Sequence, residues 1–306
     1  DAKTIGIAGH VRPDGDCMGS CMSLYNYLKK NRPDLDVRVF LEFVDKKFNI
    51  IENTDQIITT GYDGTKFDLF ISLDTASLDR LGLNLPFYEN AKRTACIDHH
   101  ASNDGYADYN YILPKASSAS EVLYDLLDED LIDKSIAEPM YMGIAHDSGV
   151  FRFQSTTPKT MRIAANMIEK GVNVNMILEE TFFRKTYNQM MVTAKIQSEA
   201  VLALDGKCIY GYCTSEMMEE YGVTTKDLDA VVASIRNVDG VEVAMFLYQL
   251  SEDSYKVSLR SKNYVDVSKI AVENGGGGHV RAAGAEIHGK LNDIINKLLN
   301  RIKQDI

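Results

Sequence analysis

Arg93-Thr94-Ala95-Cys96-Ile97-Asp98-His99-His100 is the stretch that decides the fold. The apolar run at 93–97 is predicted to be a strand, and an aspartate and two histidines follow directly where it ends. Three other segments, 10–16, 72–74 and 146–149, place acidic or histidine side chains at the end of an apolar run in the same way. Ligands of open parallel sheets bind at the carboxyl ends of the strands. The pattern therefore predicts His10, Asp74 and Asp98 along one rim of such a sheet.

The first half of the chain alternates predicted strands and helices. Strands are expected at 4–9, 37–41, 56–60, 67–73 and 93–97, and helices at 18–31, 118–127, 136–145 and 158–169. This alternation is typical of an α/β fold whose mostly parallel sheet is covered by helices on both faces. We predict one such domain over residues 1–186.

A second, smaller domain is predicted after a helical connector. The stretch 187–204 contains little Gly or Pro, so we expect a helical linker over residues 187–205. The pattern then changes to strands at 208–213, 241–250 and 255–261 and helices at 225–238 and 291–303. These elements predict a compact α/β domain over residues 206–306.

The composition limits the class of protein. The net charge is −11, which disfavours binding of long duplex nucleic acid through a broad basic face, because such binding neutralises many phosphates. It leaves room for a small phosphorylated ligand held by metals and a few arginines. No stretch of 18 apolar residues is present, so no membrane partner is expected.

The cysteines and the N-terminal segment predict a cytoplasmic protein. The five cysteines form an odd set without a C-x-x-C pair, so neither a disulfide framework nor a structural zinc site is expected. Buried apolar thiols fit a reducing cytosol. The first residues lack a basic region followed by a long apolar one, so we expect no signal peptide.

Three residues at the first cluster suggest a metal site. His10, Asp14 and Asp16 occupy a predicted turn between a strand and a helix. Imidazole with carboxylates suits Mn²⁺, and Mg²⁺ less well. Taken alone, this segment is equally well explained as a polar turn with an aspartate helix cap. The other clusters favour metal, because a carboxylate such as Asp74 at the end of a buried strand is costly unless it is paired or metal-bound.

These clusters, in this order, resemble the DHH phosphoesterase superfamily, which includes the exonuclease RecJ and family II inorganic pyrophosphatases. The run Gly275-Gly276-Gly277-Gly278-His279, followed by Arg281, is similar to the DHH-associated C-terminal domain. It points to the nanoRNase/pAp-phosphatase branch, because family II pyrophosphatases lack this loop. The resemblance covers nearly the whole chain.

The resemblance implies two Mn²⁺ ions, with Mg²⁺ or Co²⁺ as substitutes. One ion would be held by His10, Asp14 and Asp74. The other would be held by Asp16, Asp74, His99 and Asp147, so that Asp74 bridges the pair. The three residues assigned a catalytic role are His100, facing the substrate phosphate or leaving oxygen, Asp98, orienting a histidine, and Asp74. The fourth cluster departs from the family, because His-Asp-Ser-Gly replaces Thr-Asp-Thr-Gly, and His146 is interpreted either as a packed residue or as a titratable group near the site.

Substrate-binding residues are expected mainly in the second domain. Backbone N–H groups of Gly276, Gly277 and Gly278 can approach a phosphate, and His279 and Arg281 add side-chain donors. Arg260, at the end of a predicted strand, and Asn103, shortly after the two histidines, match positions that the family uses. A cleft between two domains would favour short ligands.

We therefore predict a metal-dependent phosphodiesterase or phosphatase. Its expected substrates are short oligoribonucleotides (nanoRNA), cleaved as an exonuclease, and 3′-phosphoadenosine 5′-phosphate. The alternative is a phosphodiesterase for cyclic di-AMP or linear di-adenylate, which shares every motif. RecJ-like action on long single strands is disfavoured by the acidic balance and the lack of Trp. A non-catalytic nucleotide-binding protein is disfavoured because every expected ligand is present. The sequence allows a homodimer.

Overall fold

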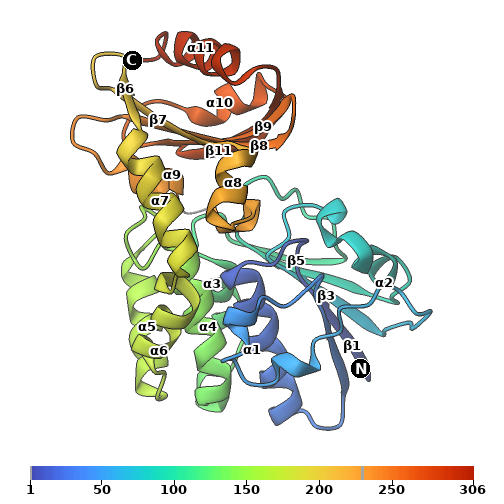
Figure 1. Cartoon of the computed structure of the whole chain (residues 1–306). Helices are drawn as coiled ribbons and strands as arrows, with labels where there is room; N and C mark the ends of the chain where they lie inside the picture. The colour runs from blue at the N-terminus through green and yellow to red at the C-terminus, as the bar shows by residue number, and fades with distance from the viewer. Residues whose placement is uncertain (1, 229–230) are drawn as a thin grey trace. The chain divides into compact units, whose positions relative to one another are not determined.

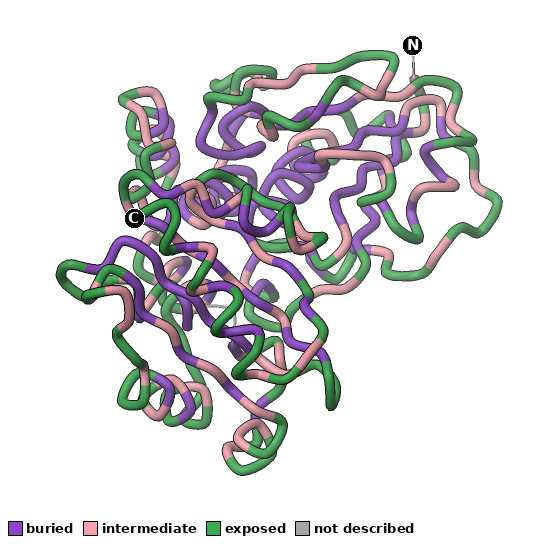
Figure 2. The backbone as a smooth tube through the Cα atoms, turned by 90° about the horizontal axis from the view of Figure 1, so that it is seen from above, coloured by how far each residue is buried: buried purple, intermediate pink, exposed green. Residues whose placement is uncertain are grey.

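The computed structural model describes residues 2–228 and 231–306. The chain divides into two compact units, of which the first ends at Arg184 and the second begins at Lys185. Each unit contains its own sheet, and Figure 1 follows the chain through both from the N- to the C-terminus. Buried residues run through the interior of each unit, while exposed ones follow the connecting loops (Figure 2).

Five parallel strands form the sheet of the first unit, in the order β2-β1-β3-β4-β5. They are β1 (Thr4–Ala8), β2 (Asp36–Phe40), β3 (Leu69–Leu73), β4 (Thr94–Asp98) and β5 (Tyr109–Ile112). Because β1, β3 and β4 are adjacent and parallel, the chain leaves all three at the same edge of the sheet. The predicted α/β class with a parallel sheet is confirmed.

Helices complete the first unit. They are α1 (Gly15–Asn31), α2 (Leu85–Glu89), α3 (Ala119–Tyr124), α4 (Lys134–Asp147), α5 (Pro158–Glu169) and α6 (Val174–Leu178), with a π-helical turn at Glu179–Phe183. Short 3₁₀ turns lie at Lys46–Phe48, Thr54–Gln56, Leu78–Asn84 and Glu129–Leu131. Successive side chains of a strand point to opposite faces of the sheet. Ile71 of β3 therefore belongs to the large apolar layer beneath α1 and α4, whereas Phe70 belongs to a smaller, aromatic layer.

Helices α1 and α4 pack against each other along much of their length and run antiparallel (Figure 1). A Cβ placed on Gly19 would lie 2.4 Å from the carbonyl oxygen of Pro139 and 2.8 Å from the amide nitrogen of Gly143. Farther along the pair, the Ser23 hydroxyl donates to the carbonyl oxygen of Ile136 at 3.2 Å. This pairing brings the start of α1 beside the end of α4.

The second unit is built on a six-stranded mixed sheet of order β10-β11-β9-β8-β7-β6. Its strands are β6 (Val201–Ala203), β7 (Cys208–Cys213), β8 (Val243–Ser251), β9 (Ser254–Ser261), β10 (Gly277–His279) and β11 (Ala282–His288). Its helices are α7 (Tyr187–Glu199), α8 (Ser215–Tyr221), α9 (Val231–Arg236), α10 (Val267–Val272) and α11 (Leu291–Ile302), with a 3₁₀ turn at Thr225–Asp227. Among the described residues of this unit, only β7 and β8 pair in parallel.

Several elements differ from those predicted. The prediction of a strand at 56–60 is wrong, because this segment forms an isolated bridge between Ile58 and Phe40 and is not a strand. The helix expected over 187–204 ends at Glu199, because Ala200 adopts an extended backbone and 201–203 pair with β7. Of the helix expected over 225–238, the turn 225–227 and the helix 231–236 are observed, and positions 229–230 lie outside the described residues.

Four of the observed strands were not predicted. The pattern did not indicate β5, β6 or β11, and the glycine run at 276–278 was predicted as a loop, whereas 277–279 pair with β11. None of the helices in residues 2–228 and 231–306 combines the length and apolar character needed to cross a bilayer.

Candidate metal centre and active site

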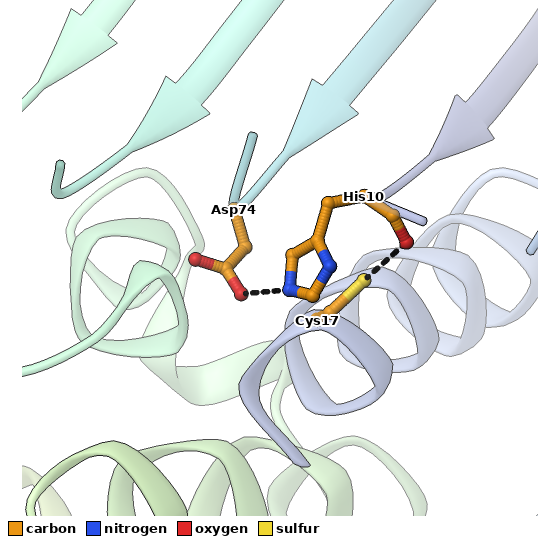
Figure 3. A group of neighbouring side chains, drawn as sticks. All are labelled: His10, Cys17 and Asp74. Atoms are coloured by element: carbon orange, nitrogen blue, oxygen red, sulfur yellow. Dashed lines mark hydrogen bonds and ion pairs between the residues drawn. The ribbon is translucent and has the colours of Figure 1, made fainter. Parts of the chain in front are cut away.

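His10 follows β1 and has its ring held in one orientation. Its Nδ1 lies 2.7 Å from the carbonyl oxygen of Val11, which requires the proton on Nδ1 and leaves the lone pair on Nε2. Nε2 lies 3.4 Å from Oδ2 of Asp74 and 3.8 Å from Oδ2 of Asp14. Figure 3 shows the imidazole of His10 directed at the Asp74 carboxylate. Burial lowers the pKa of His10, but neighbouring groups outweigh it and raise that pKa to about 12, so Nε2 of the protonated ring must give up its proton before His10 binds a metal on the side that faces two carboxylates.

Asp14 and Asp16 lie in different surroundings, and Asp16, which was predicted in the turn before the helix, belongs to the first turn of α1. Asp14 caps α1, and its Oδ1 accepts from the amides of Asp16 and Cys17 at 3.0 and 3.1 Å. Asp16 is fully buried and accepts from the amides of Ala119 and Ser120 at 2.5 and 3.0 Å, and from the Ser120 hydroxyl at 2.6 Å. The N-terminus of α3 therefore orients the Asp16 carboxylate.

Asp74 lies at the centre of the cluster. It follows the last residue of β3, is 2 % exposed and has a φ of +52°, in the left-handed region that non-glycine residues rarely adopt. Its Oδ1 is buried and makes no hydrogen bond within residues 2–228 and 231–306. Strained backbone of this kind clusters at functional sites.

His99 faces the other carboxylate oxygen of Asp74. Its Nε2 lies 3.4 Å from Oδ1 of Asp74, 3.1 Å from Oδ2 of Asp147 and 4.0 Å from Oδ2 of Asp16. This nitrogen is also buried without a hydrogen bond in the described part of the chain. The two carboxylate oxygens of Asp74 therefore face two different histidines.

His100 is oriented by the aspartate that begins the motif. Its Nδ1 lies 2.8 Å from Oδ1 of Asp98, whose other oxygen accepts from the Asn103 amide at 2.7 Å. Burial raises the pKa of Asp98, but His100 and Asn103 outweigh it and lower that pKa below its usual range. Asn103 is itself buried and also donates to the carbonyl oxygen of Thr75. The Asn103 side chain, which was expected to contact substrate, is thus hydrogen-bonded inside the protein, where it supports Asp98.

Asp147 ends α4 beside an unusual backbone turn. Gly149, Val150 and Phe151 have φ values of +58°, +57° and +61° in succession. Left-handed backbone is unfavourable for a β-branched residue such as Val150. Sequence patterns gave no sign of this turn.

His146, whose role the sequence left open, is a packed residue. Its Nε2 lies 2.9 Å from the Thr181 hydroxyl, and its ring contacts those of Phe48 and Phe182. A Cβ on Gly15 would lie only 2.1 Å from the ring, so the imidazole supports the backbone between Asp14 and Asp16. Burial and the nearby charge of Lys47 lower the pKa of His146 to about 4, so that it is neutral at pH 7.

The electrostatics of the cluster fit divalent cations. Burial, with the negative charges of Asp74 and Asp147, raises the pKa of Asp16 well above its usual value. Burial also raises the pKa of Asp147 to about 6. Burial lowers the pKa of His99, but Asp147, Asp74 and Asp16 outweigh it and raise that pKa to about 12. When these carboxylates are ionised and no metal ion is bound, their negative charges repel one another.

The separations of the donor atoms also fit shared ions. Two ligand atoms bound at about 2.1 Å to one ion lie roughly 3–3.5 Å apart. Three pairs in the cluster, His10 with Asp74, His99 with Asp74 and His99 with Asp147, lie 3.1–3.4 Å apart. All six residues predicted as metal ligands come together here: His10, Asp14, Asp16, Asp74, His99 and Asp147.

In the second unit, two of the predicted substrate-binding residues share one row of the sheet. His279 pairs with Ala282, and Ala282 pairs with Arg260 on the next strand. Residues directly opposite one another across strands project from the same face. His279 and Arg260 therefore lie on one face, about two strand spacings or 10 Å apart.

Arg281 is directed at a neighbouring loop. Its guanidinium donates to the carbonyl oxygens of Val265, at 2.8 Å, and Asn263. The buried Glu242 accepts from the backbone amides of the same loop, 263–265. Burial raises the pKa of Glu242, but these amides outweigh it and lower that pKa. The sequence gave no signal for this loop. Its carbonyl oxygens accept some of the hydrogen bonds that Arg281 was expected to donate to a phosphate.

Comparisons with known proteins match both parts of the chain. Residues 4–144 match the DHH family N-terminal domain, and residues 205–304 match the DHHA1 domain. The bifunctional oligoribonuclease and PAP phosphatase NrnA of Thermus thermophilus is 31% identical, with 98% of this chain and 89% of that protein covered. The Bacillus subtilis protein of the same name is 28% identical, with coverage of 93% and 90%.

A solved structure supports the fold of the whole chain. The exopolyphosphatase-related protein from Bacteroides fragilis superposes with a TM-score of 0.91 at 24% identity, covering 99% of this chain and 93% of that one. The order of the acidic and histidine clusters and the match of both domains lead to one conclusion. The chain belongs to the DHH family of phosphoesterases and carries a DHHA1 domain after its DHH domain.

Proposed function

We propose that the protein is an Mn²⁺-dependent phosphoesterase that hydrolyses short oligoribonucleotides and 3′-phosphoadenosine 5′-phosphate with two metal ions. The observation that carries this proposal is Asp74, whose Oδ2 faces His10 and whose Oδ1 faces His99, each at 3.4 Å. A carboxylate with one oxygen toward each of two imidazoles is suited to bridge two ions. Mixed nitrogen and oxygen donors favour Mn²⁺ over Mg²⁺.

The residues divide into two ligand sets around this bridge. We assign His10, Asp14 and Asp74 to one ion, and Asp16, Asp74, His99 and Asp147 to the other. Bound together, two such ions stabilise the negative charge of the attacking and leaving oxygens in phosphoryl transfer. No serine or cysteine nucleophile is then required.

His100 acts beside the ions. Its hydrogen bond to Asp98 holds the ring in a fixed orientation, and Asn103 supports the other oxygen of that carboxylate. We assign His100 the transfer of a proton to the leaving oxygen, which is general acid catalysis. Asp98 and Asn103 are positioning residues for this step.

The substrate class comes from the relatives and the composition. Two relatives that cover nearly the whole chain carry names stating oligoribonuclease and PAP phosphatase activity. The net charge of −11 is unfavourable for long nucleic acids, whose binding rests on neutralising many phosphates. We propose that Arg260 and His279, on one face of the second sheet, bind the substrate, with Arg281 and the backbone of Gly276, Gly277 and Gly278.

A substrate panel with chelated and Mn²⁺-loaded protein tests this function. The panel compares a diribonucleotide, longer RNAs, 3′-phosphoadenosine 5′-phosphate, cyclic di-AMP and linear di-adenylate. We expect turnover of the diribonucleotide and the bisphosphate only with metal. Preference for cyclic di-AMP would overturn the proposed substrate, and metal-free turnover would overturn the mechanism.

Metal stoichiometry tests the bridge itself. Two ions are expected per wild-type chain, and fewer in the Asp74→Ala variant. Glu138→Gln is the matched control, because Glu138 is another buried acidic residue of the first unit that lies outside the cluster. It should retain both ions and full activity.

A further inference from the structure

A cysteine sulfur lies beside the proposed metal centre. Cys17 is completely buried in the first turn of α1. Its Sγ, a ring nitrogen of His10 and a carboxylate oxygen of Asp74 all lie within 4.8 Å of one another. Figure 3 shows the three side chains converging from β1, β3 and the start of α1. Oδ2 of Asp74 lies 3.4 Å from Nε2 of His10, so two of the three donors already face each other at the separation that one bound ion requires.

The position of the sulfur is fixed by its surroundings. A Cβ on Gly9 would lie 2.2 Å from Sγ, so the sulfur rests directly against the backbone before His10. Sγ also lies 3.8 Å from the carbonyl oxygen of His10, and the Cys17 amide donates to Asp14. The thiol is therefore held beside the ligands and does not rotate freely.

Sulfur changes which ions such a site prefers. Carboxylates and imidazole suit Mn²⁺, whereas a thiolate selects softer ions such as Zn²⁺ and Cd²⁺. We propose that His10, Cys17 and Asp74 form a sulfur-containing site that captures a thiophilic divalent ion in competition with Mn²⁺. On capture, the thiol proton passes to water, the sulfur lone pair bonds to the ion, and no redox change occurs. The competition rests on the proposed function, but the sulfur bond does not.

Cadmium titration of the chelator-treated full chain tests the proposal. Cadmium–thiolate bonds absorb in the ultraviolet through charge transfer, whereas bonds from cadmium to oxygen or nitrogen ligands lack this band. We expect the band in the wild type and its loss in Cys17→Ser. Cys208→Ser is the matched control, because Cys208 is equally buried but lies in the second unit and belongs to no group of close ligand atoms in the described residues. It should keep the band.

The affinities give a second readout. Cys17→Ser should weaken Cd²⁺ binding by about tenfold or more, because even loss of a partner outside the ligand shell costs about 10–100-fold. Its Mn²⁺ affinity should stay close to that of the wild type. An unchanged band in Cys17→Ser, or loss of the band in Cys208→Ser, would overturn the proposal.

Cadmium NMR of the wild type keeps the test independent of how the variants fold. A cadmium resonance shifted downfield, as one sulfur donor produces, supports the site, and a resonance typical of nitrogen and oxygen ligands alone overturns it. Phosphoesterase assays with Mn²⁺ separate the two claims. A sulfur-bound cadmium in a chain without phosphoesterase activity would refute the proposed function and leave this site standing.

Discussion

Gly15→Ala should disturb the metal-binding turn through one steric contact. The new Cβ would lie 2.1 Å from Cγ of His146 and 2.2 Å from its Nδ1, far inside the 3.4 Å at which ordinary van der Waals contact begins. His146 cannot move aside easily, because Phe48, Phe182 and Thr181 surround it. The strain therefore falls on the turn that carries Asp14 and Asp16.

The expected magnitude follows from overpacking of a filled interior, which costs about 1–3 kcal/mol. We expect the free energy of unfolding of the first unit to fall by this amount in denaturant titrations of the metal-free chain. Metal affinity should fall at least about tenfold, equivalent to roughly 1.4 kcal/mol, because two ligands are displaced. Isothermal titration calorimetry with Mn²⁺ measures this change.

A double-mutant cycle with His146→Ala decides whether this contact is the cause. Removing the imidazole leaves space for the new methyl group, so the double variant should regain metal affinity relative to Gly15→Ala alone. Contacting residues typically show coupling energies of about 0.5–3 kcal/mol. Strict additivity of the two substitutions, in both stability and metal affinity, would refute the reasoning.

Four further outcomes are expected. Asp74→Ala should lower kcat by about 10³-fold or more, roughly 4 kcal/mol of barrier, and a folded variant with near-normal rates would remove Asp74 as the bridge. Asp98→Asn should lower kcat more than it raises KM, because His100 loses its orienting acceptor; steady-state kinetics showing the reverse would contradict this. Metal binding must displace the protons of His10 and His99, whose pKa values are each raised to about 12, so apparent Mn²⁺ affinity should rise with pH by up to about a hundredfold per unit between about pH 6 and 8; a flat calorimetric profile would exclude it. Initial rates on an RNA length ladder should show kcat/KM falling about tenfold between dimers and twenty-mers, and equal efficiency at both lengths would contradict the proposed short substrate.

The sequence predicted the ligands better than it predicted their surroundings. His10, Asp74 and Asp98 could be placed on one rim because apolar strand runs end at them and parallel strands share an edge. The three donors from α3 that hold Asp16 could not be predicted, because residues more than a hundred positions apart meet there. Long-range packing of this kind leaves no local pattern.

Local patterns also failed where backbone conformation overrides propensity. The left-handed turn at 149–151 includes a valine that propensity would place in a strand, and the glycine run at 276–278 continues into a short edge strand. Asn103 was expected to face substrate, but its amide is used within the protein, as only the fold could reveal. His279 and Arg260 lie in one row across the second sheet because of the register between its strands. Residue types alone did not determine that register.

The spread of the metal ligands along the chain has a consequence for assembly. The six ligands run from position 10 to position 147, and each group enters from the end of a different element. A bound ion thus ties together distant parts of one polypeptide and removes conformational freedom from its unfolded state, much as a cross-link does. During synthesis the cluster cannot be complete until residue 147 has emerged, so ion capture should be a late event in maturation of the first unit. None of the ligands comes from the second unit, so the ions should reinforce the N-terminal part of the chain selectively against heat and proteolysis.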